Sequence, residues 1–173
     1  MLSSAQLVAL TTDQAAKLTT DQVKALTVTQ IAKLETADLA KLGTSHIQAL
    51  STASVAALTA DQFKSLASNQ LNALTSSQVK ALTTDQVIGL STDQAAALTT
   101  DQVKALAVSS VAAMGSNQIN AMTTSQVGAL TAAQLKGLTT DTLAAMGTTQ
   151  VAALTTGQVA SLTVASVGAM TST

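Results

Sequence analysis

The chain lacks several residue types on which common functional sites depend. It contains no cysteine, proline, tryptophan, tyrosine or arginine, and only one phenylalanine and one histidine. The absence of cysteine excludes disulfides, thiolate catalysis and cysteine-ligated metals. A single aromatic residue provides no platform on which bases or sugars could stack. These absences argue against many enzyme and nucleic-acid-binding classes before any motif is considered.

Charge is also scarce. Charged residues make up 10% of the 173 residues, and the formal net charge is −1. This balance offers no electrostatic footprint for nucleic acid or for an anionic membrane. No apolar run approaches the length of a membrane span, and the start, MLSSAQLVAL, has no basic segment typical of a cleavable signal peptide. We therefore expect no nucleic-acid partner, no membrane insertion and no cleavable signal peptide.

The chain consists of one eight-residue motif that is repeated in a single register from Leu2 to Met170. The clearest copies lie between Leu82 and Leu106, which reads LTTDQVIGLSTDQAAALTTDQVKAL. We label the positions of this octad a to h. Leu or Met occupies a, Thr or Ser mostly b, Asp often d, Gln usually e, an apolar residue f, and small residues or Lys g and h. With no linker or change of composition, residues 1–173 are predicted to form one continuous repeat domain.

The order of residues in the octad is typical of a helix start. A hydroxyl at b can accept a hydrogen bond from the backbone N–H at e, while Gln at e reaches back to the N–H at b, which is a capping box. Asp at d would lie in the first turn, where the helix dipole favours negative charge. The apolar residues at a and f occupy the positions of a hydrophobic staple. Each octad is thus predicted to be one short helix, roughly c to h, followed by a corner at a and b.

Two other architectures compete with this one. In one continuous helix, successive Leu residues would precess by about 80° per octad, so no apolar stripe would survive. A β-solenoid also suits a short fixed period with rows of Thr. However, Ala, Gln, Asp and Lys are poor strand formers, and a and f would lie on opposite faces of a strand. We favour the all-α reading and keep the β-solenoid as the alternative.

Energetics favour a solenoid over independent helices. A helix of six or seven residues is too short to be stable alone in water. One cap contributes about 1 kcal/mol, which is less than the entropy cost of ordering eight residues. Burial of the residues at a and f, worth about 1.5–3 kcal/mol each, must supply the rest. The prediction is therefore an all-α solenoid with one short capped helix per octad and small g and h residues that allow close packing.

Residues with catalytic or metal-binding chemistry do not cluster. His46 occupies position e and is best interpreted as a substitute cap. The Asp residues at d occur once per octad and do not form the oxygen cage that a cation needs. No base or acid partner set accompanies the many hydroxyl groups. We predict no enzyme activity, no catalytic residue, no cofactor and no metal site.

The octad L-[TS]-T-x-Q-[VI]-x-A resembles the repeat regions of very large bacterial secreted or surface proteins of adhesin-like or haem-utilisation type. The resemblance covers the whole chain and implies an extracellular or cell-surface location. It favours a structural spacer or fibre subunit. The alternative is an adhesin-type binding module that presents a repeated Thr/Gln/Asp surface to a protein or polysaccharide partner.

The two ends of the chain carry no polar capping octad. The first octad keeps Leu2 and Leu7, and the last keeps Val167 before Met170, so both ends are expected to expose apolar surface. No charged residue follows Asp141, a stretch that reflects either repeat drift, a contact surface or an uncleaved export signal. We expect the chain to associate with itself head to tail into oligomers or filaments, with cell-surface components as further possible partners.

Overall fold

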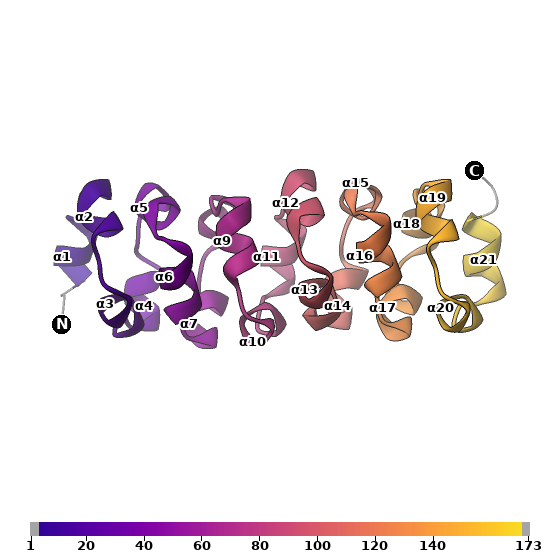
Figure 1. The fold of residues 1–173 in the computed structure, drawn as a ribbon, viewed down its shortest axis with the longest axis horizontal. Coiled ribbons are helices and arrows are strands. Elements are labelled where there is room, and N and C mark those ends of the chain that lie inside the picture. Colours follow the sequence, from indigo (N-terminus) through magenta and orange to yellow (C-terminus); the bar gives the residue numbers. More distant parts are fainter. Residues whose placement is uncertain (1–3, 171–173) are drawn as a thin grey trace.

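The computed structural model describes residues 4–170, and within them every octad forms one short helix and no residue forms a strand. The helices follow one another along a single elongated row, with the two termini at opposite ends (Figure 1). The prediction of an all-α solenoid is therefore confirmed, and the β-solenoid alternative was wrong. The helices are α1 Ser4–Val8, α2 Thr12–Ala16, α3 Thr20–Lys24, α4 Val28–Ile31, α5 Thr36–Lys41, α6 Thr44–Ala49, α7 Thr52–Ala56, α8 Ala60–Lys64, α9 Ser68–Ala73, α10 Ser76–Lys80, α11 Thr84–Ile88, α12 Thr92–Ala97, α13 Thr100–Ala105, α14 Val108–Ala112, α15 Ser116–Ala121, α16 Thr124–Ala129, α17 Ala132–Gly137, α18 Thr140–Ala144, α19 Thr148–Ala152, α20 Thr156–Ala160 and α21 Val164–Met170.

The capping box predicted for the octad is present in most helices. In α13 the backbone N–H of Gln102 donates to the Thr99 hydroxyl at 3.1 Å, and the Thr99 N–H donates to Gln102 Oε1 at 3.0 Å. Where Gly or Ala occupies position b, the hydroxyl bond is missing, but in all of these helices except α14 the side chain at e still accepts the N–H of b. Gly115, for example, donates to Gln118 Oε1 at 3.0 Å. Position b is thus the N-cap, as the sequence indicates.

The corner between helices consists of extended residues and not of glycine turns. Leu98, at position a, has φ −58° and ψ 141°, and the following Thr99 has φ −72° and ψ 158°. No described residue has a positive φ, glycines included. Two extended residues after each helix change the chain direction, which explains how the solenoid turns without proline or the turn glycines that most loops use.

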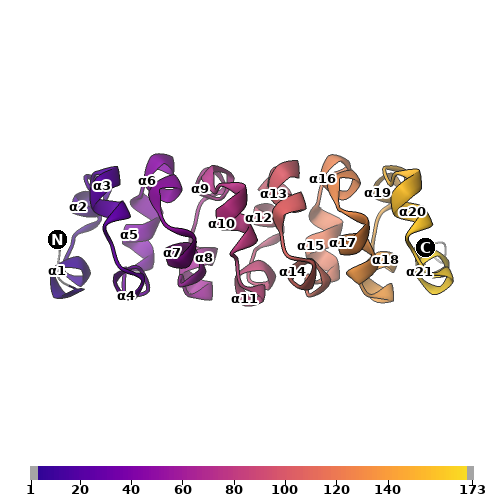
Figure 2. The same ribbon diagram turned by 90° about the horizontal axis from the view of Figure 1, so that it is seen from below.

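The row of helices winds into a superhelix whose turn contains between three and four octads. Helices pack against the third helix along the chain, as in α14 with α17 and α18 with α21. The two perpendicular views show successive helices passing around the long axis of the molecule (Figures 1 and 2). Each octad therefore lies over octads of the preceding turn, and most of its tertiary contacts are not with its immediate neighbour.

Positions a and f form one continuous core along this axis. Val103 at f is fully buried and Leu106 at a is 4% exposed, and the same two positions are buried in nearly every turn. The Met residues substitute for Leu at a, with Met114 3% exposed. Small residues allow the helices to approach, since a Cβ on Gly137 would lie 3.4 Å from atoms of both Val108 and Ala112 in the preceding turn.

A first prediction concerns the hydroxyl at the N-cap. Replacing Thr99 by Ala should lower the free energy of unfolding by about 1 kcal/mol, because one helix loses a capping bond. The matched change, Ala107 to Thr, should raise it by a similar amount, because Ala107 is an N-cap with extended backbone and no side-chain cap bond. Urea unfolding followed by circular dichroism measures both. Equal stability of the two variants would contradict the assignment of b as the cap.

Candidate functional site

The glutamines at position e are buried and connect successive turns of the superhelix. Gln102 is 3% exposed, and its Nε2 donates to the carbonyl oxygens of Leu71 at 2.7 Å and Leu74 at 2.9 Å. These acceptors belong to position f of the octad four places earlier and to the a position that follows it. We call this repeated arrangement the glutamine ladder. The equivalent pair of carbonyls is bonded by Gln62, Gln70, Gln78, Gln86, Gln118, Gln126, Gln134, Gln150 and Gln158.

Each glutamine of the ladder therefore uses both ends of its amide. The amide oxygen accepts the N-cap N–H of its own helix, and the amide nitrogen donates to two main-chain carbonyls one turn earlier. Buried main-chain carbonyls near helix ends and corners need such partners. Sequence analysis assigned position e to capping alone and missed the contact between turns. The binding alternative also counted Gln as part of a repeated exposed surface. That part was wrong, because these side chains are buried and the exposed repeat consists mainly of positions b, c and d.

Hydroxyl residues interrupt the ladder at four octads. Ser54, Ser110, Thr142 and Ser166 occupy position e there and are buried. Three of them fold back on their own N-cap, as in the 2.8 Å contact between the hydroxyls of Ser51 and Ser54. A hydroxyl side chain is too short to reach the preceding turn, so position e of these octads contributes no bond to that turn. The octads of Ser54 and Ser110 still accept glutamine bonds from the turn that follows them.

Asp38 places a carboxyl group in the same buried position. The residue is 1% exposed, and its Oδ2 is buried without a hydrogen-bond partner. The side chain is one methylene shorter than Gln, and the N-cap Glu35 has no side-chain cap bond. Burial raises the pKa of Asp38 above its ordinary value of 3.8, and the neighbouring carboxylate of Glu35 raises it further. Sequence analysis did not single out Asp38 and missed this buried carboxyl group with an unsatisfied oxygen.

His46 acts as the predicted substitute cap. Its Nδ1 accepts the N–H of Gly43 at 3.1 Å, in the way that the glutamine oxygen does in other octads. The side chain is partly buried. Within the described residues, no group of three or more His, Cys, Asp or Glu side chains is placed to hold a metal ion.

The ladder gives the superhelix a direction, and its two ends differ. Gln14 and Gln22 in the first turn are exposed, whereas Gln150 and Gln158 near the other end are each 4% exposed. Position f shows the reverse. Leu7 and Ala15 are fully buried, whereas Val159 is 42% and Val167 36% exposed. The glutamines thus face the N-terminal end, and the f residues face the C-terminal end.

This asymmetry corrects the expectation for the ends. Leu7 is fully buried, so it exposes no apolar surface, and Met170 is only 9% exposed. Leu2 lies outside the described residues. The expectation holds for Val167, which joins Val159 and the half-buried Leu154 and Leu162 in an apolar C-terminal face. The reason is geometric, because an f side chain is covered by the turn that follows it.

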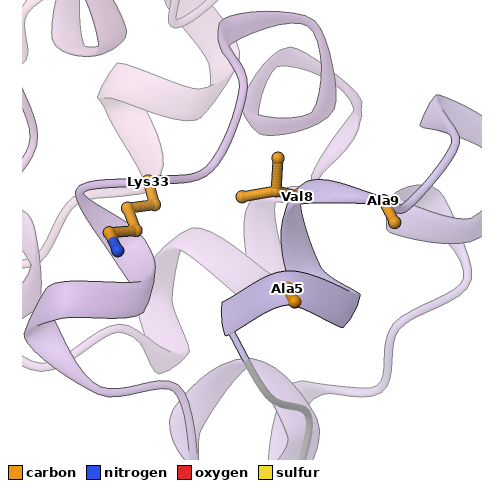
Figure 3. A pocket seen from close by; sticks show the side chains of 4 residues that line it. All are labelled: Ala5, Val8, Ala9 and Lys33. Atoms are coloured by element: carbon orange, nitrogen blue, oxygen red, sulfur yellow. The ribbon is translucent and has the colours of Figure 1, made fainter.

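A shallow hollow lies beside the first helix, lined by Ala5, Val8, Ala9 and Lys33 (Figure 3). Three of the four residues are small or apolar, and the single ammonium group has no acid or base beside it in this set. The arrangement offers neither a catalytic pair nor a ligand cage. Its main feature is the exposed Val8 at the N-terminal end of the solenoid, where it is 43% exposed.

The exterior of the solenoid carries few charge pairs. Lys104 and Asp101 approach to 4.0 Å on the exposed side of one helix, a contact worth little in water. Among the described residues, none of the helices is long and apolar enough to cross a membrane. The geometry therefore points to the ends and the ladder, not to a pocket, as the parts of the molecule able to form specific contacts.

Comparison with known proteins supports the repeat character of most of the chain. The family model of the ALTTAQ repeat matches residues 1–28, 31–68, 63–92, 103–132 and 132–164. Each match is longer than one octad, so the repeat that the family model describes contains several copies of the eight-residue motif. No curated protein matches the chain.

Proposed function

The chain belongs to the ALTTAQ repeat family of repeat proteins, and we propose that it is a non-enzymatic spacer or fibre subunit that associates end to end with copies of itself. The observation that carries this proposal is the difference between the two ends of the solenoid. The N-terminal end presents the amide groups of Gln14 and Gln22, and the C-terminal end presents Val159 and Val167. In the interior of the chain, these two kinds of surface are buried against each other in most turns.

Association through unlike ends has a predictable outcome. A head-to-tail contact between identical subunits does not use up both ends, so further copies add at either side. The last octads carry no charged side chain after Asp141, so there is no like-charge repulsion at the C-terminal end to oppose contact. The expected product is a linear oligomer or filament that grows along the solenoid axis.

The setting of this function is proposed to be the cell surface or the extracellular space. The support is the resemblance of the octad to repeat regions of large bacterial secreted and surface proteins, together with the absence of cysteine. A second candidate is a binding module. It is favoured by the exposed Thr, Ser and Asp residues at b, c and d, which recur around the exterior of the solenoid and could contact a protein or polysaccharide.

The second prediction is that the 173-residue chain associates in a concentration-dependent way. Sedimentation velocity and light scattering between micromolar and millimolar concentrations should show species heavier than 17.3 kDa that increase with concentration. Negative-stain images of the heavier species should show particles lengthened along one axis only. A strict monomer over the whole range would contradict end-to-end association and leave the spacer function alone.

A further inference from the structure

We infer that the junction between two copies continues the glutamine ladder, with Gln14 and Gln22 of one copy donating to main-chain carbonyls in the last turn of the other. This inference rests on the proposed end-to-end association and specifies its contacts. In such a junction, hydrogen bonds of fixed spacing select the partner. Burial of apolar side chains supplies most of the binding free energy.

The donor side is defined by two glutamines with half-used amides. Gln14 Oε1 accepts the N–H of Thr11 at 2.9 Å, and Gln22 Oε1 accepts the N–H of Thr19 at 2.8 Å. Within the described part of the chain, the Nε2 of each makes no hydrogen bond, because the carbonyls that an interior glutamine reaches lie 28 and 31 residues earlier. Both residues are exposed. Their caps already fix the side chains in the orientation that interior glutamines use, so little rotamer freedom remains to be lost on binding.

The acceptor side is defined by carbonyls that the ladder leaves open. The last described ladder bonds run from Gln158 to Val127 and Leu130. In the octads that follow, described f and a carbonyls receive no glutamine hydrogen bond. There are five successive pairs of this kind, and the last three lie at the C-terminal end: Val151 with Leu154, Val159 with Leu162, and Val167 with Met170.

The spacing of donors matches the spacing of acceptors. Gln14 and Gln22 are one octad apart, as are Gln126 and Gln134 of the interior, which bond two successive carbonyl pairs at 2.6 to 2.9 Å. Two of the last three pairs can therefore be engaged at the same time. The same contact covers Val159, which is 42% exposed, whereas Val127 at the same position one turn earlier is fully buried.

The occupant of this surface is a second copy of the chain because only a ladder end supplies both features. Any apolar surface could cover Val159 and Val167. Amide groups at one-octad spacing, held by their own capping boxes and flanked by small residues, are what most interior turns of this chain present to the turn before them. The superhelix then continues across the junction without a change in packing.

Gln14→Glu together with Gln22→Glu tests the junction. Glu still accepts the N-cap N–H in a capping box, so each helix keeps its cap. It replaces the amide donor by a carboxylate that would face two carbonyl oxygens. At neutral pH the double variant should keep the thermal unfolding temperature of the parent and associate at least about tenfold more weakly. Gln48→Glu, which adds one negative charge at an exposed position away from the ends, should associate like the parent.

A change of pH separates loss of the donor from other effects. About one unit below the ordinary Glu pKa of about 4.3, the carboxyl groups are protonated and can donate again. Association of the double variant, relative to the parent at the same pH, should then recover. A double variant that associates as tightly as the parent at neutral pH would overturn the ladder junction while end-to-end association stands. A parent that is strictly monomeric would overturn both.

Discussion

Replacing Gln102 by Glu is expected to open the centre of the solenoid at neutral pH, with a loss of at least about 4 kcal/mol in the free energy of unfolding. The substitution keeps the cap acceptor for the Thr99 N–H and leaves the shape of the side chain unchanged. It removes the two bonds to Leu71 and Leu74, at 2.7 and 2.9 Å, and places a carboxylate against those carbonyl oxygens. Within the described residues, no lysine side chain hydrogen-bonds to Gln102, so none compensates the new charge.

The same substitution at Gln14 is the control for the Gln102 prediction. Gln14 has the same capping box, but its side chain is exposed and its Nε2 makes no hydrogen bond in the described structure. Gln14→Glu should therefore change stability by no more than about 0.5 kcal/mol. Urea unfolding at pH 7 and hydrogen exchange of the helices around residues 71–102 measure the difference. If both variants were equally stable, the ladder would contribute nothing beyond capping.

The short capped helices could be predicted because every signal for them lies within one octad. Thr99 and Gln102 are three residues apart, so their reciprocal bonds depend on local geometry alone. The same holds for the corner, where two extended residues follow each helix. Burial at a and f also follows from the pattern, because a chain of such short helices has no other apolar surface with which to form a core.

The contact between turns could not be predicted from local pattern alone. Whether Gln102 reaches Leu71 and Leu74 depends on how many octads complete a turn, and that number is set by packing of helices three places apart. One signal in the sequence does point to the second role. Position e is Gln in most octads and never Glu, although Glu closes a capping box equally well. A preference for the amide over the carboxylate indicates that the nitrogen, and not only the oxygen, has a partner.

At the ends of the solenoid, too, the sequence predicts one property and only the structure shows the other. The sequence indicates that neither terminal octad is polar, and from this alone both ends appear equivalent. The structure makes them different because e and f residues point in opposite directions along the axis. Leu7 is buried by the turn that follows it, whereas Val167 is 36% exposed because no further turn lies over it within the described residues. The difference between the two ends arises only when the octads are stacked, so the sequence of a single octad does not reveal it.

The second large effect is expected at Asp38, where a substitution should stabilise the fold and not destabilise it. Replacing Asp38 by Gln should raise the free energy of unfolding at pH 7 by about 2 kcal/mol or more. The new amide can close the capping box on Glu35 and, by the spacing of the ladder, reach the carbonyls of Leu7 and Leu10. The substitution also removes a carboxyl oxygen that is buried without a partner.

The pH dependence follows from the raised pKa of Asp38. Because burial disfavours the ionised form in the folded state, the unfolded chain loses the Asp38 proton at a lower pH than the folded chain does. The contribution of Asp38 to stability is therefore most favourable below its ordinary pKa of 3.8 and falls as the pH rises towards the raised folded value. The groups nearest in the packing are Glu35 and Lys41 of its own octad, Asp13 and Lys17 around α2, and Asp61 and Lys64 of α8. Within the described structure none of them forms an ion pair with Asp38.

Two variants separate the charge of Asp38 from its short reach. Asp38→Asn removes the ionisable group, but the Asn side chain is as short as Asp. It should therefore abolish the pH dependence that Asp38 causes and recover only part of the stability. Asp38→Gln should abolish the pH dependence and recover the rest. Asp101→Asn, at an exposed aspartate, should leave the pH profile of the parent unchanged. Unfolding measured from pH 3 to pH 8, with hydrogen exchange of α1, α2 and α5, tests these expectations. A parent whose stability does not fall above about pH 4, the ordinary range of a carboxyl group, would show that Asp38 is not held in its neutral form by the fold.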